Sequence, residues 1–334
     1  MVSMHFSVVV LNYNNWKDTV ACIESILCSD DTPESIVIID NNSNDDSVAR
    51  IQEWAVAARE KRWPVERDGR MFPLETLTEK GMLSAGPLQK LILVCCDKNG
   101  GYAAGNNVGI RLALRSGAQA VWVLNNDTLV ESAAAGAMYR RLFSSSRPGL
   151  CGSLVRYMDG DKLVQCRGGG RFCKWTGLSV LDGHLLPVSE ALAESTAAVE
   201  ERINFIYGAS VMASRQFLET VGLMDERYFL YCEEQDWAYG AKGRFDFCYA
   251  SDAVVWHKEG ASSGHCRKNF NPRRLWYLLR SRLLLTWKWT PITLPVVSLC
   301  CIFAGVRLVL RRLTWENIRY MLGKSRSNRN FCQE

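Results

Sequence analysis

The N-terminal part of the chain alternates two hydrophobic patterns, and this alternation restricts the fold more than any other feature of the sequence. Residues 6–11 (FSVVVL) form an apolar, largely β-branched run, which is typical of a strand buried on both faces of a parallel sheet. Residues 16–27 follow with apolar side chains at helical spacing. The two patterns then repeat, as a strand over 35–39 and a helix over 47–58. This order predicts an α/β fold with a mostly parallel, doubly wound sheet flanked by helices.

Further segments of both kinds extend the predicted sheet along the chain. In a doubly wound sheet, ligands bind beyond the carboxyl ends of the strands, so the residues directly after each strand are the first candidates for a site. The predicted strands are 91–95, 120–124 and 150–155, and the predicted helices are 107–116 and 132–143.

Two stretches interrupt the alternation. Residues 60–90 hold clustered charges, Pro and Gly without a clean period, and they are predicted to form an inserted surface loop. Residues 156–200 contain Gly-rich turns that indicate hairpins, followed by an Ala-rich helix over 189–199. We expect one α/β domain over residues 1–265 and a basic, amphipathic helical region over 266–334.

Polar residues directly follow two of the predicted strands. Asp40 directly follows the apolar run IVII at residues 36–39, and Asp127 ends the run LNND at residues 124–127. A carboxylate beyond a strand end can bind a ribose, a base, or a hard cation such as Mg²⁺ or Mn²⁺. Each can instead cap the following helix, which is the commoner role of Asp in such turns. The segment 99–107 (NGGYAAGNN) adds small residues that let backbone N–H groups approach a ligand.

A third polar cluster has apolar and aromatic neighbours. Glu233, Glu234 and Asp236 follow an aromatic run and directly precede a Trp. Carboxylates in such surroundings are usually paired, bind a metal or have a raised pKa, and a raised pKa suits a general base. His257 ends a later apolar run (VVWH), where it is either a metal or phosphate ligand or a buried structural histidine.

Charge is distributed unevenly along the chain. Residues 261–334 hold 14 Lys and Arg but only 2 Asp and Glu, whereas the rest of the chain is acidic. Residues 275–289 combine Leu, Trp and Arg, and residues 291–306 contain no charged side chain. A bilayer span needs about 20 apolar residues, so the uncharged run is short for a crossing. We expect a helical region at an anionic membrane surface, and the alternative is a hairpin buried in a soluble core or dimer interface.

The cysteines and the N-terminal sequence indicate the cellular compartment of the protein. The chain has 13 Cys but no CxxC pair, so the ligand spacing of a structural zinc site is absent. Most of these cysteines lie in apolar runs, as buried reduced thiols do. The first predicted strand begins close to the N-terminus without a preceding signal-peptide pattern. These features predict a cytoplasmic protein, peripheral at the inner face of the cell membrane.

Taken together, the motifs resemble those of family 2 glycosyltransferases with the GT-A fold, and in particular the rhamnosyltransferase-like branch. Each motif is loose by itself, but their common order and spacing are specific. The resemblance covers residues 6–285 of the chain. The motifs are VVVLNYNNW at 8–16, IIDNNSNDDS at 38–47, NGGYAAGNNVGI at 99–110, LNNDT at 124–128, GASVMASRQFLETVGLMDERYFLYCEEQDW at 208–237 and VWHKEGASSG at 255–264.

The resemblance implies an inverting, metal-dependent hexosyltransferase that uses a nucleotide-diphospho-sugar donor. Asp127, at the DXD position of the family, and His257 would hold Mg²⁺ or Mn²⁺. Glu234 would be the catalytic base, with Glu233 and Asp236 as the alternatives. The residues implied in binding the donor are Asn12, Tyr13, Asp40, Asn42, Asn99, Gly100, Gly101, Asn106 and Asn126.

Two positions depart from the family pattern. The DXD position begins with Asn125, so it supplies a single carboxylate, and Glu234 stands where the family usually has Asp. The resemblance favours dTDP-rhamnose as the donor, with UDP-sugars as alternatives. It also implies a glycan acceptor in the synthesis of a cell-surface polysaccharide. The basic C-terminal region with its uncharged run at 291–306 favours an acceptor carried on a polyprenyl lipid.

Three other functions share parts of this pattern. A nucleotidyltransferase also combines an α/β sheet, a nucleotide and a metal-binding carboxylate, but it would carry a basic Gly-rich loop near the N-terminus, where residues 12–18 hold only Lys17. A catalytically inactive sugar-binding module of the same fold would be consistent with Asn125. A nucleic-acid binder would explain the basic tail, but the tail has no recognition motif, so nucleic acid is not an expected partner.

Overall fold

The computed structural model describes residues 4–60, 74–80, 91–158, 162–258, 272–307 and 310. These residues pack as two units. The first unit contains residues up to 172 together with 179–281, and the second contains 173–178 and the chain from 282 onward. The boundary predicted between residues 265 and 266 lies outside the described residues.

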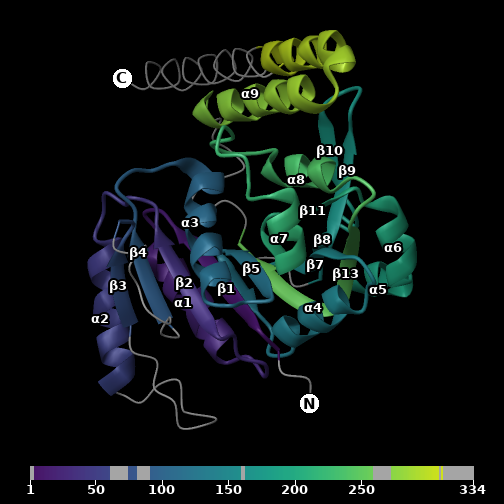
Figure 1. Cartoon of the computed structure of the whole chain (residues 1–334). Coiled ribbons are helices and arrows are strands. Elements are labelled where there is room, and N and C mark those ends of the chain that lie inside the picture. The colour runs from purple at the N-terminus through teal and green to yellow at the C-terminus, as the bar shows by residue number, and fades with distance from the viewer. Residues whose placement is uncertain are drawn as a thin grey trace, which may run out of the picture. The chain divides into compact units, whose positions relative to one another are not determined.

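The first unit is built on one large sheet (Figure 1). Its strands are β1 (Phe6–Asn12), β2 (Ser35–Asp40), β3 (Leu74–Thr78), β4 (Leu91–Cys95), β5 (Ala120–Asn125), β6 (Thr128–Val130), β7 (Pro148–Tyr157), β8 (Val164–Arg167), β12 (Ser210–Ser214) and β13 (Asp246–His257). The order is β3-β4-β2-β1-β5-β12-β7-β13-β6, with β8 paired to β7. The first five strands in this order are parallel, and β12 is antiparallel to both of its neighbours. The predicted fold class, a mostly parallel sheet flanked by helices, is confirmed.

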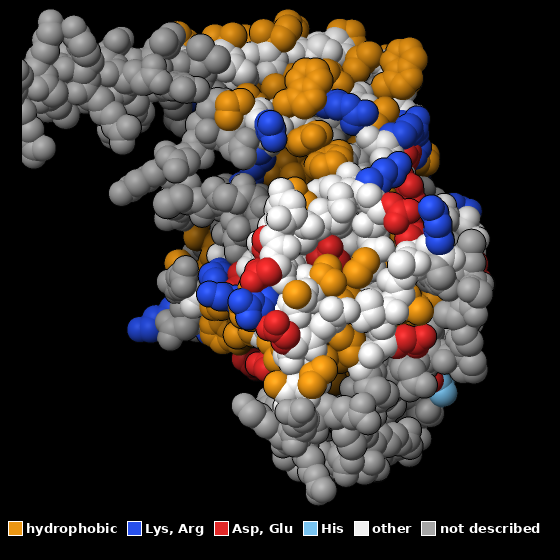
Figure 2. Space-filling model, turned by 90° about the vertical axis from the view of Figure 1, so that its left-hand side faces the viewer, with side chains coloured by type: hydrophobic (Ala, Val, Ile, Leu, Met, Phe, Trp, Pro, Cys, Tyr) orange, Lys and Arg blue, Asp and Glu red, His pale blue; other side chains and the backbone are white. Residues whose placement is uncertain are grey.

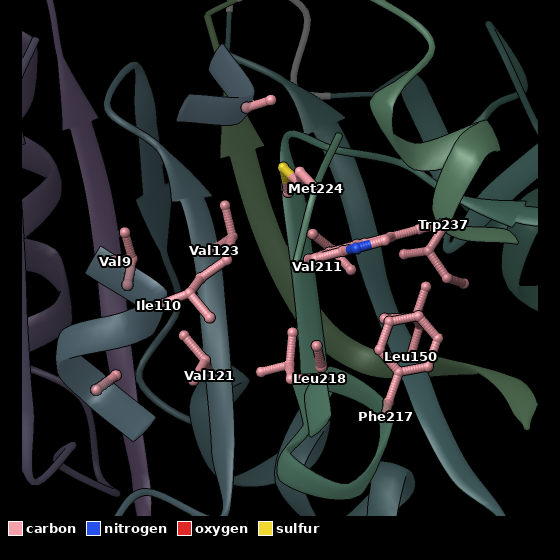
Figure 3. Close-up of a cluster of buried hydrophobic side chains, with 14 of the residues drawn as sticks. Val9, Ile110, Val121, Val123, Leu150, Val211, Phe217, Leu218, Met224 and Trp237 are labelled. Atoms are coloured by element: carbon pink, nitrogen blue, oxygen red, sulfur yellow. The ribbon is translucent and has the colours of Figure 1, made fainter. Parts of the chain in front are cut away.

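Helices cover both faces of the sheet and bury two hydrophobic clusters. Strand β1 shows how its side chains alternate, because Val9 belongs to one cluster and Val8 and Val10 belong to the other. Figure 3 shows the first cluster, in which Phe217 and Trp237 make an edge-to-face contact with ring centroids 5.6 Å apart. The helices are α1 (Trp16–Leu27), α2 (Ser47–Glu60), α3 (Gly101–Arg115), α4 (Ala134–Phe143), α7 (Arg215–Val221) and α8 (Glu233–Ala241).

The prediction of a loop over 60–90 was wrong for the part that forms β3. This strand pairs in parallel with β4 at the edge of the sheet. Its side chains are intermediate or exposed, so it lacks the continuous apolar run that marks the central strands. Residues 61–73 and 81–90 lie outside the described ranges.

Two predicted helices have different limits in the structure. Helix α3 begins at Gly101 and not at residue 107, so the small residues of the Gly-rich segment form its first turns. The Ala-rich segment 189–199 divides into two helices because the Ser195 hydroxyl accepts a hydrogen bond from the Ala198 amide and caps the second one. These are α5 (Val188–Ala193) and α6 (Thr196–Arg202).

A second, smaller sheet contains the hairpin elements predicted within 156–200. Its strands are β9 (Gly169–Cys173), β10 (Leu178–Leu181) and β11 (Phe205–Ile206), in the order β10-β9-β11. Gly168, between β8 and β9, has a φ of 71°, which favours glycine at this turn.

The C-terminal part of the described chain is helical, as predicted. Helix α9 spans Pro272–Trp289, and its residues from 282 onward belong to the second unit. A short 3₁₀ turn, Pro291–Thr293, follows it, and residues 294–307 are again helical. No helix in the part of the chain that the structure describes is long and apolar enough to span a membrane.

Candidate functional site

The strand register brings the polar strand ends of the parallel sheet together. Asn12 at the end of β1 is level with Asp40 at the end of β2. Leu11 is in turn level with Asn125 at the end of β5. The loops after these three strands therefore meet at the carboxyl edge of the sheet, where ligands of such sheets bind.

Asp127 and His257 form a buried pair beside this edge. His257 is in register with Thr128, the residue that follows Asp127. The Asp127 Oδ1 and His257 Nε2 atoms are 3.1 Å apart, and His257 Nδ1 lies 2.7 Å from the side-chain oxygen of Gln165. If Nδ1–H donates to Gln165, the lone pair of a neutral imidazole faces the carboxylate through Nε2. Such an arrangement is favourable when a proton or a cation lies between the two atoms.

The chemistry of this pair suits a divalent cation. Carboxylate oxygen and imidazole nitrogen are both metal ligands, and a metal-binding His commonly donates its other ring N–H to an oxygen, as His257 can to Gln165. Within the described ranges, no group of three or more His, Cys, Asp or Glu side chains is placed to hold a metal. A cation here would therefore take most of its ligands from substrate and water, as Mg²⁺ often does.

Glu234 lies in the first turn of α8 and contacts the segment before β12. Its Oε1 accepts a hydrogen bond from the Gly208 amide at 3.1 Å, and the Tyr102 hydroxyl donates to the Gly208 carbonyl at 2.6 Å. The preceding Tyr231 and Cys232 both have positive φ, 73° and 74°, which is uncommon for residues other than glycine. Burial raises the pKa of the Glu234 carboxyl, as a general base acting near neutral pH requires.

Gly208→Ala is expected to displace the Glu234 carboxylate, because a Cβ at residue 208 would overlap its side chain. We expect about tenfold to hundredfold lower kcat with the same fold, since misplacing a reacting group by 1 Å has an effect of this order. Steady-state kinetics and circular dichroism check this prediction. Gly222→Ala is not a suitable control because Gly222 has positive φ, so the matched control is Gly305→Ala, where a Cβ meets no neighbour.

Glu233 lies beside Glu234 but is only 2% exposed. Its Oε1 has no hydrogen-bond partner among the described residues. Burial, and then the nearby Glu234 charge, raise the pKa of the Glu233 carboxyl well above its ordinary value of 4.5. A carboxyl group of this kind favours the protonated form in the folded chain.

Glu233→Gln is expected to stabilise the fold at neutral pH. When the pKa of a carboxyl is higher in the folded chain than in the unfolded chain, the carboxyl does not lower stability at pH values below the unfolded-state pKa. The free energy of unfolding then falls as the pH rises through the folded-state pKa. The neutral amide avoids this loss. We therefore expect the variant to have a free energy of unfolding about 1–3 kcal/mol higher than the wild type at neutral pH, and we expect this difference to disappear near pH 4. Denaturant unfolding at several pH values measures it, with the exposed Glu201→Gln as control. A gain that does not depend on pH would contradict the assignment.

These groups line one cavity of about 520 Å³. The basic side chains of Arg273 and Arg274, in the first turn of α9, line it as well, together with Tyr277. Arg274 lies over the Tyr231 ring, with its guanidinium carbon 5.5 Å from the ring centroid. The cavity thus combines acidic, basic and aromatic side chains, which is suited to a charged ligand that carries a sugar.

The cavity brings together many of the residues predicted for the site. Those that line it are Tyr13, Asn99, Gly101, Asn126, Asp127, Glu233, Glu234 and His257. Those that do not line it are Asn12, Asp40, Asn42, Gly100, Asn106 and Asp236.

Several of the residues outside the cavity wall hold its loops in place. The Asp40 carboxylate accepts hydrogen bonds from the Asn12 amide at 2.8 Å and from the Ser43 hydroxyl at 2.6 Å. Asp236 accepts one from the Tyr228 hydroxyl at 3.2 Å. Buried hydrogen bonds of this kind fix the backbone on which lining residues are carried.

Asn41 is a lining residue that the sequence patterns missed. Its side-chain amide donates to the Asn99 side-chain oxygen at 3.0 Å and to the Gly101 carbonyl at 3.1 Å, and its oxygen accepts from the Gly100 amide at 3.2 Å. It therefore ties the loop after β2 to the start of α3. Its position directly after Asp40, at a strand end, was the available signal.

Other lining residues gave weaker signals in the sequence. Tyr102 and Gly208 lie inside motifs that were recognised only as whole segments, and Arg273 and Arg274 belong to a region interpreted as a basic tail. These and the other lining residues that were not predicted are Leu11, Asn41, Tyr102, Asn125, Tyr207, Gly208, Ala209, Phe229, Leu230, Arg273, Arg274 and Tyr277.

Comparison with known proteins finds a family match for the N-terminal part of the chain and a likeness of fold for most of it. Residues 7–68, which include β1, β2 and the polar residues that end them, match Glycosyl transferase family 2. The structure of GalNAc-T7 with UDP, GalNAc and Mn²⁺ has the same fold, with a TM-score of 0.51 and 16% identity, over 77% of this chain and 44% of that one. The likeness over most of this chain shows that it has the GT-A fold. The chain spans less than half the length of the GalNAc-T7 chain.

Other solved structures show a weaker likeness to this chain. The structure of S. aureus TarS 1–349 in complex with UDP has 12% identity and a TM-score of 0.48, over 88% of this chain and 70% of that one. The mannosyltransferase PcManGT from Pyrobaculum calidifontis, in complex with GDP-Man and Mn²⁺, has 13% identity and a TM-score of 0.47, over 95% and 80%. No curated protein matches the sequence.

Proposed function

We propose that this chain transfers a sugar from a nucleotide-diphospho-sugar to a hydroxyl group of an acceptor, with inversion of the anomeric centre. The observation that carries the proposal is that Glu234, Asp127 and His257 line the same cavity. Displacement at an anomeric carbon needs a base for the acceptor proton and positive charge for the departing diphosphate. The cavity has residues suited to both tasks.

The nucleotide is assigned to the carboxyl ends of β1 and β2, where Tyr13, Asn41 and Asn99 line the cavity. Nucleotides bind at this edge in other doubly wound sheets. Asn126 and Gly101 lie on the same cavity wall. Five further residues do not line the cavity and are assigned to supporting its wall at this end: Asn12, Asp40, Asn42, Gly100 and Asn106.

Mg²⁺ or Mn²⁺ is assigned to Asp127 Oδ1 and His257 Nε2, with Gln165 orienting the imidazole. A bound divalent cation would supply positive charge to the diphosphate of the donor. The occurrence of Mn²⁺ with UDP in the GalNAc-T7 structure supports a metal and a nucleotide of this kind. The single carboxylate at the DXD position makes His257 the second protein ligand.

Glu234 is assigned as the general base. Its carboxylate would accept the proton of the acceptor hydroxyl as that oxygen attacks the anomeric carbon from the face opposite the diphosphate. The Gly208 amide holds the carboxylate in place from the other side. Glu233 and Asp236 are assigned to supporting α8, because Glu233 is buried and Asp236 bonds to Tyr228 outside the cavity wall.

The resemblance of the sequence motifs supports dTDP-rhamnose as the donor and UDP-sugars as alternatives. The basic C-terminal region with its uncharged run at 291–306 supports a polyprenyl-linked glycan as the acceptor, in the synthesis of a cell-surface polysaccharide at the inner face of the membrane. Tyr231 and Tyr277 line the cavity and offer aromatic faces on which an acceptor sugar can stack. The nearby Tyr228 and Trp237 are buried and do not have this role.

A donor panel tests the proposal. Isothermal titration with dTDP-, UDP- and GDP-sugars, each with and without Mn²⁺, should find one donor whose binding is tighter with the metal. Free dTDP, UDP and GDP serve to separate recognition of the nucleotide from recognition of the sugar. If no nucleotide or nucleotide-sugar binds in the presence of metal, the proposed function is wrong.

A further inference from the structure

The second unit exposes a set of large apolar side chains. Figure 2 shows hydrophobic side chains gathered on the C-terminal helices, with Lys and Arg side chains among them. Ile292 is 85% exposed and Phe303 is 77% exposed. Single exposed apolar residues are common, but a continuous group of them marks a binding surface. We name five of them the apolar stripe: Ile292, Val296, Leu299, Phe303 and Val306.

The spacing of the apolar stripe places it along one side of a helix. Its members follow one another at three or four residues, which is the period of a helix face. The other side of the same helix is covered, because Val297 and Cys301 are buried. A Cβ at Gly177 would lie 2.9 Å from Val297, so the turn 173–178 is part of this cover. The helix thus has one apolar side that is packed and a second that is open.

Cations accompany the apolar stripe. The described residues of this unit contain Lys174, Arg282, Lys288 and Arg307, and no Asp or Glu. Trp287 and Trp289 flank Lys288 and are also exposed, and aromatic residues of this kind prefer the boundary between lipid and water. An apolar side with Trp and Phe, bordered by Lys and Arg, is typical of a helix that lies in the plane of a membrane interface.

We propose that the apolar stripe binds the surface of an anionic lipid bilayer. The described helices are not long and apolar enough to span it, so the segment 291–307 lies in the interface and the cations of the unit contact lipid phosphates. A second copy of this chain is a poorer occupant, because two such surfaces would bring cations together without acids from the described residues of either unit. The biological role of this membrane binding rests on the proposed function, since a lipid-linked acceptor is located at the membrane surface.

Vesicle binding by the full chain tests the proposal. Partition is measured on vesicles of phosphatidylcholine with and without phosphatidylglycerol, for the wild type, for the double variant Leu299→Gln with Phe303→Gln, and for Val56→Gln. Val56 is an exposed apolar residue of α2 and is the matched control. We expect binding that requires phosphatidylglycerol, weakens with salt, and falls by at least about tenfold in the double variant but not in the control.

Two outcomes overturn the proposal. One is equal partition of the wild type and the double variant. The other is a wild-type dimer that does not bind vesicles and that the double variant converts to a monomer, because the apolar stripe would then be a self-association surface. Donor hydrolysis without lipid is measured on the same samples. If the double variant hydrolyses the donor as fast as the wild type, it is folded. If the wild type does not hydrolyse the donor, this result counts against the proposed function and not against membrane binding.

Discussion

Glu234→Gln is expected to lower kcat by about 10²- to 10⁴-fold, which is the usual contribution of a general base. The amide has nearly the same shape and can still accept the hydrogen bond from the Gly208 amide, but it cannot take a proton. Donor binding should therefore stay close to that of the wild type. In the wild type, kcat should rise with pH as the carboxyl ionises, at a pH above the ordinary value of 4.5, because burial raises the pKa of Glu234.

Steady-state kinetics with a saturating donor, together with titration of donor binding, measure both effects. The exposed Glu201→Gln on α6 is the matched control and should leave both unchanged. The same experiment on Glu233→Gln separates the two neighbouring acids. If Glu233→Gln abolished turnover and Glu234→Gln did not, the base would be Glu233.

Asp127→Asn is expected to lower kcat by about 10²- to 10³-fold, the order found when charge stabilisation is removed from an active site. Its physical effect is to remove the only carboxylate of the Asp127–His257 pair and to leave the imidazole beside a neutral amide. The binding of Mn²⁺ in the presence of a nucleoside diphosphate should weaken in parallel. Electron paramagnetic resonance of free Mn²⁺ measures that binding without any turnover.

The exposed Asp252→Asn on β13 is the matched control for charge and should bind Mn²⁺ as the wild type does. His257→Ala should also weaken metal binding, because it removes the second assigned ligand. If Asp127→Asn kept the wild-type response to Mn²⁺, the cation would lie elsewhere and the assignment of Asp127 would be wrong.

The central strands were predictable because they are buried on both faces. The runs in β1 and β2 are almost wholly apolar, and all of their residues except the partly exposed Leu11 are buried. Strand β3 could not be predicted in this way, since it lies at the edge of the sheet with partly exposed side chains. The start of α3 at Gly101 was missed because glycine is a poor helix former. Its position reflects close packing, since a Cβ there would overlap the Phe229 backbone.

The site was predictable where chemistry coincides with a strand or helix end. Asp127 and Glu234 were visible for this reason, and both line the cavity. Asp40 has the same sequence pattern, but its hydrogen bonds to Asn12 and Ser43 are made within the protein. Arg273 was not predictable, because nothing in its local sequence indicates that the start of α9 lines the cavity. Such contacts depend on tertiary packing, which local patterns do not contain.

Donor hydrolysis followed by NMR tests the central claim most directly. The wild type is incubated with Mn²⁺ and the donor that the binding panel identifies, with water as the acceptor. We predict release of a nucleoside diphosphate and a first sugar product with inverted configuration, both lost in Glu234→Gln. Release of a sugar 1-phosphate would instead indicate cleavage between the two phosphates, as in a nucleotidyltransferase. Tight binding without release of either product, even with acceptor glycans present, would contradict the account and favour a sugar-binding module.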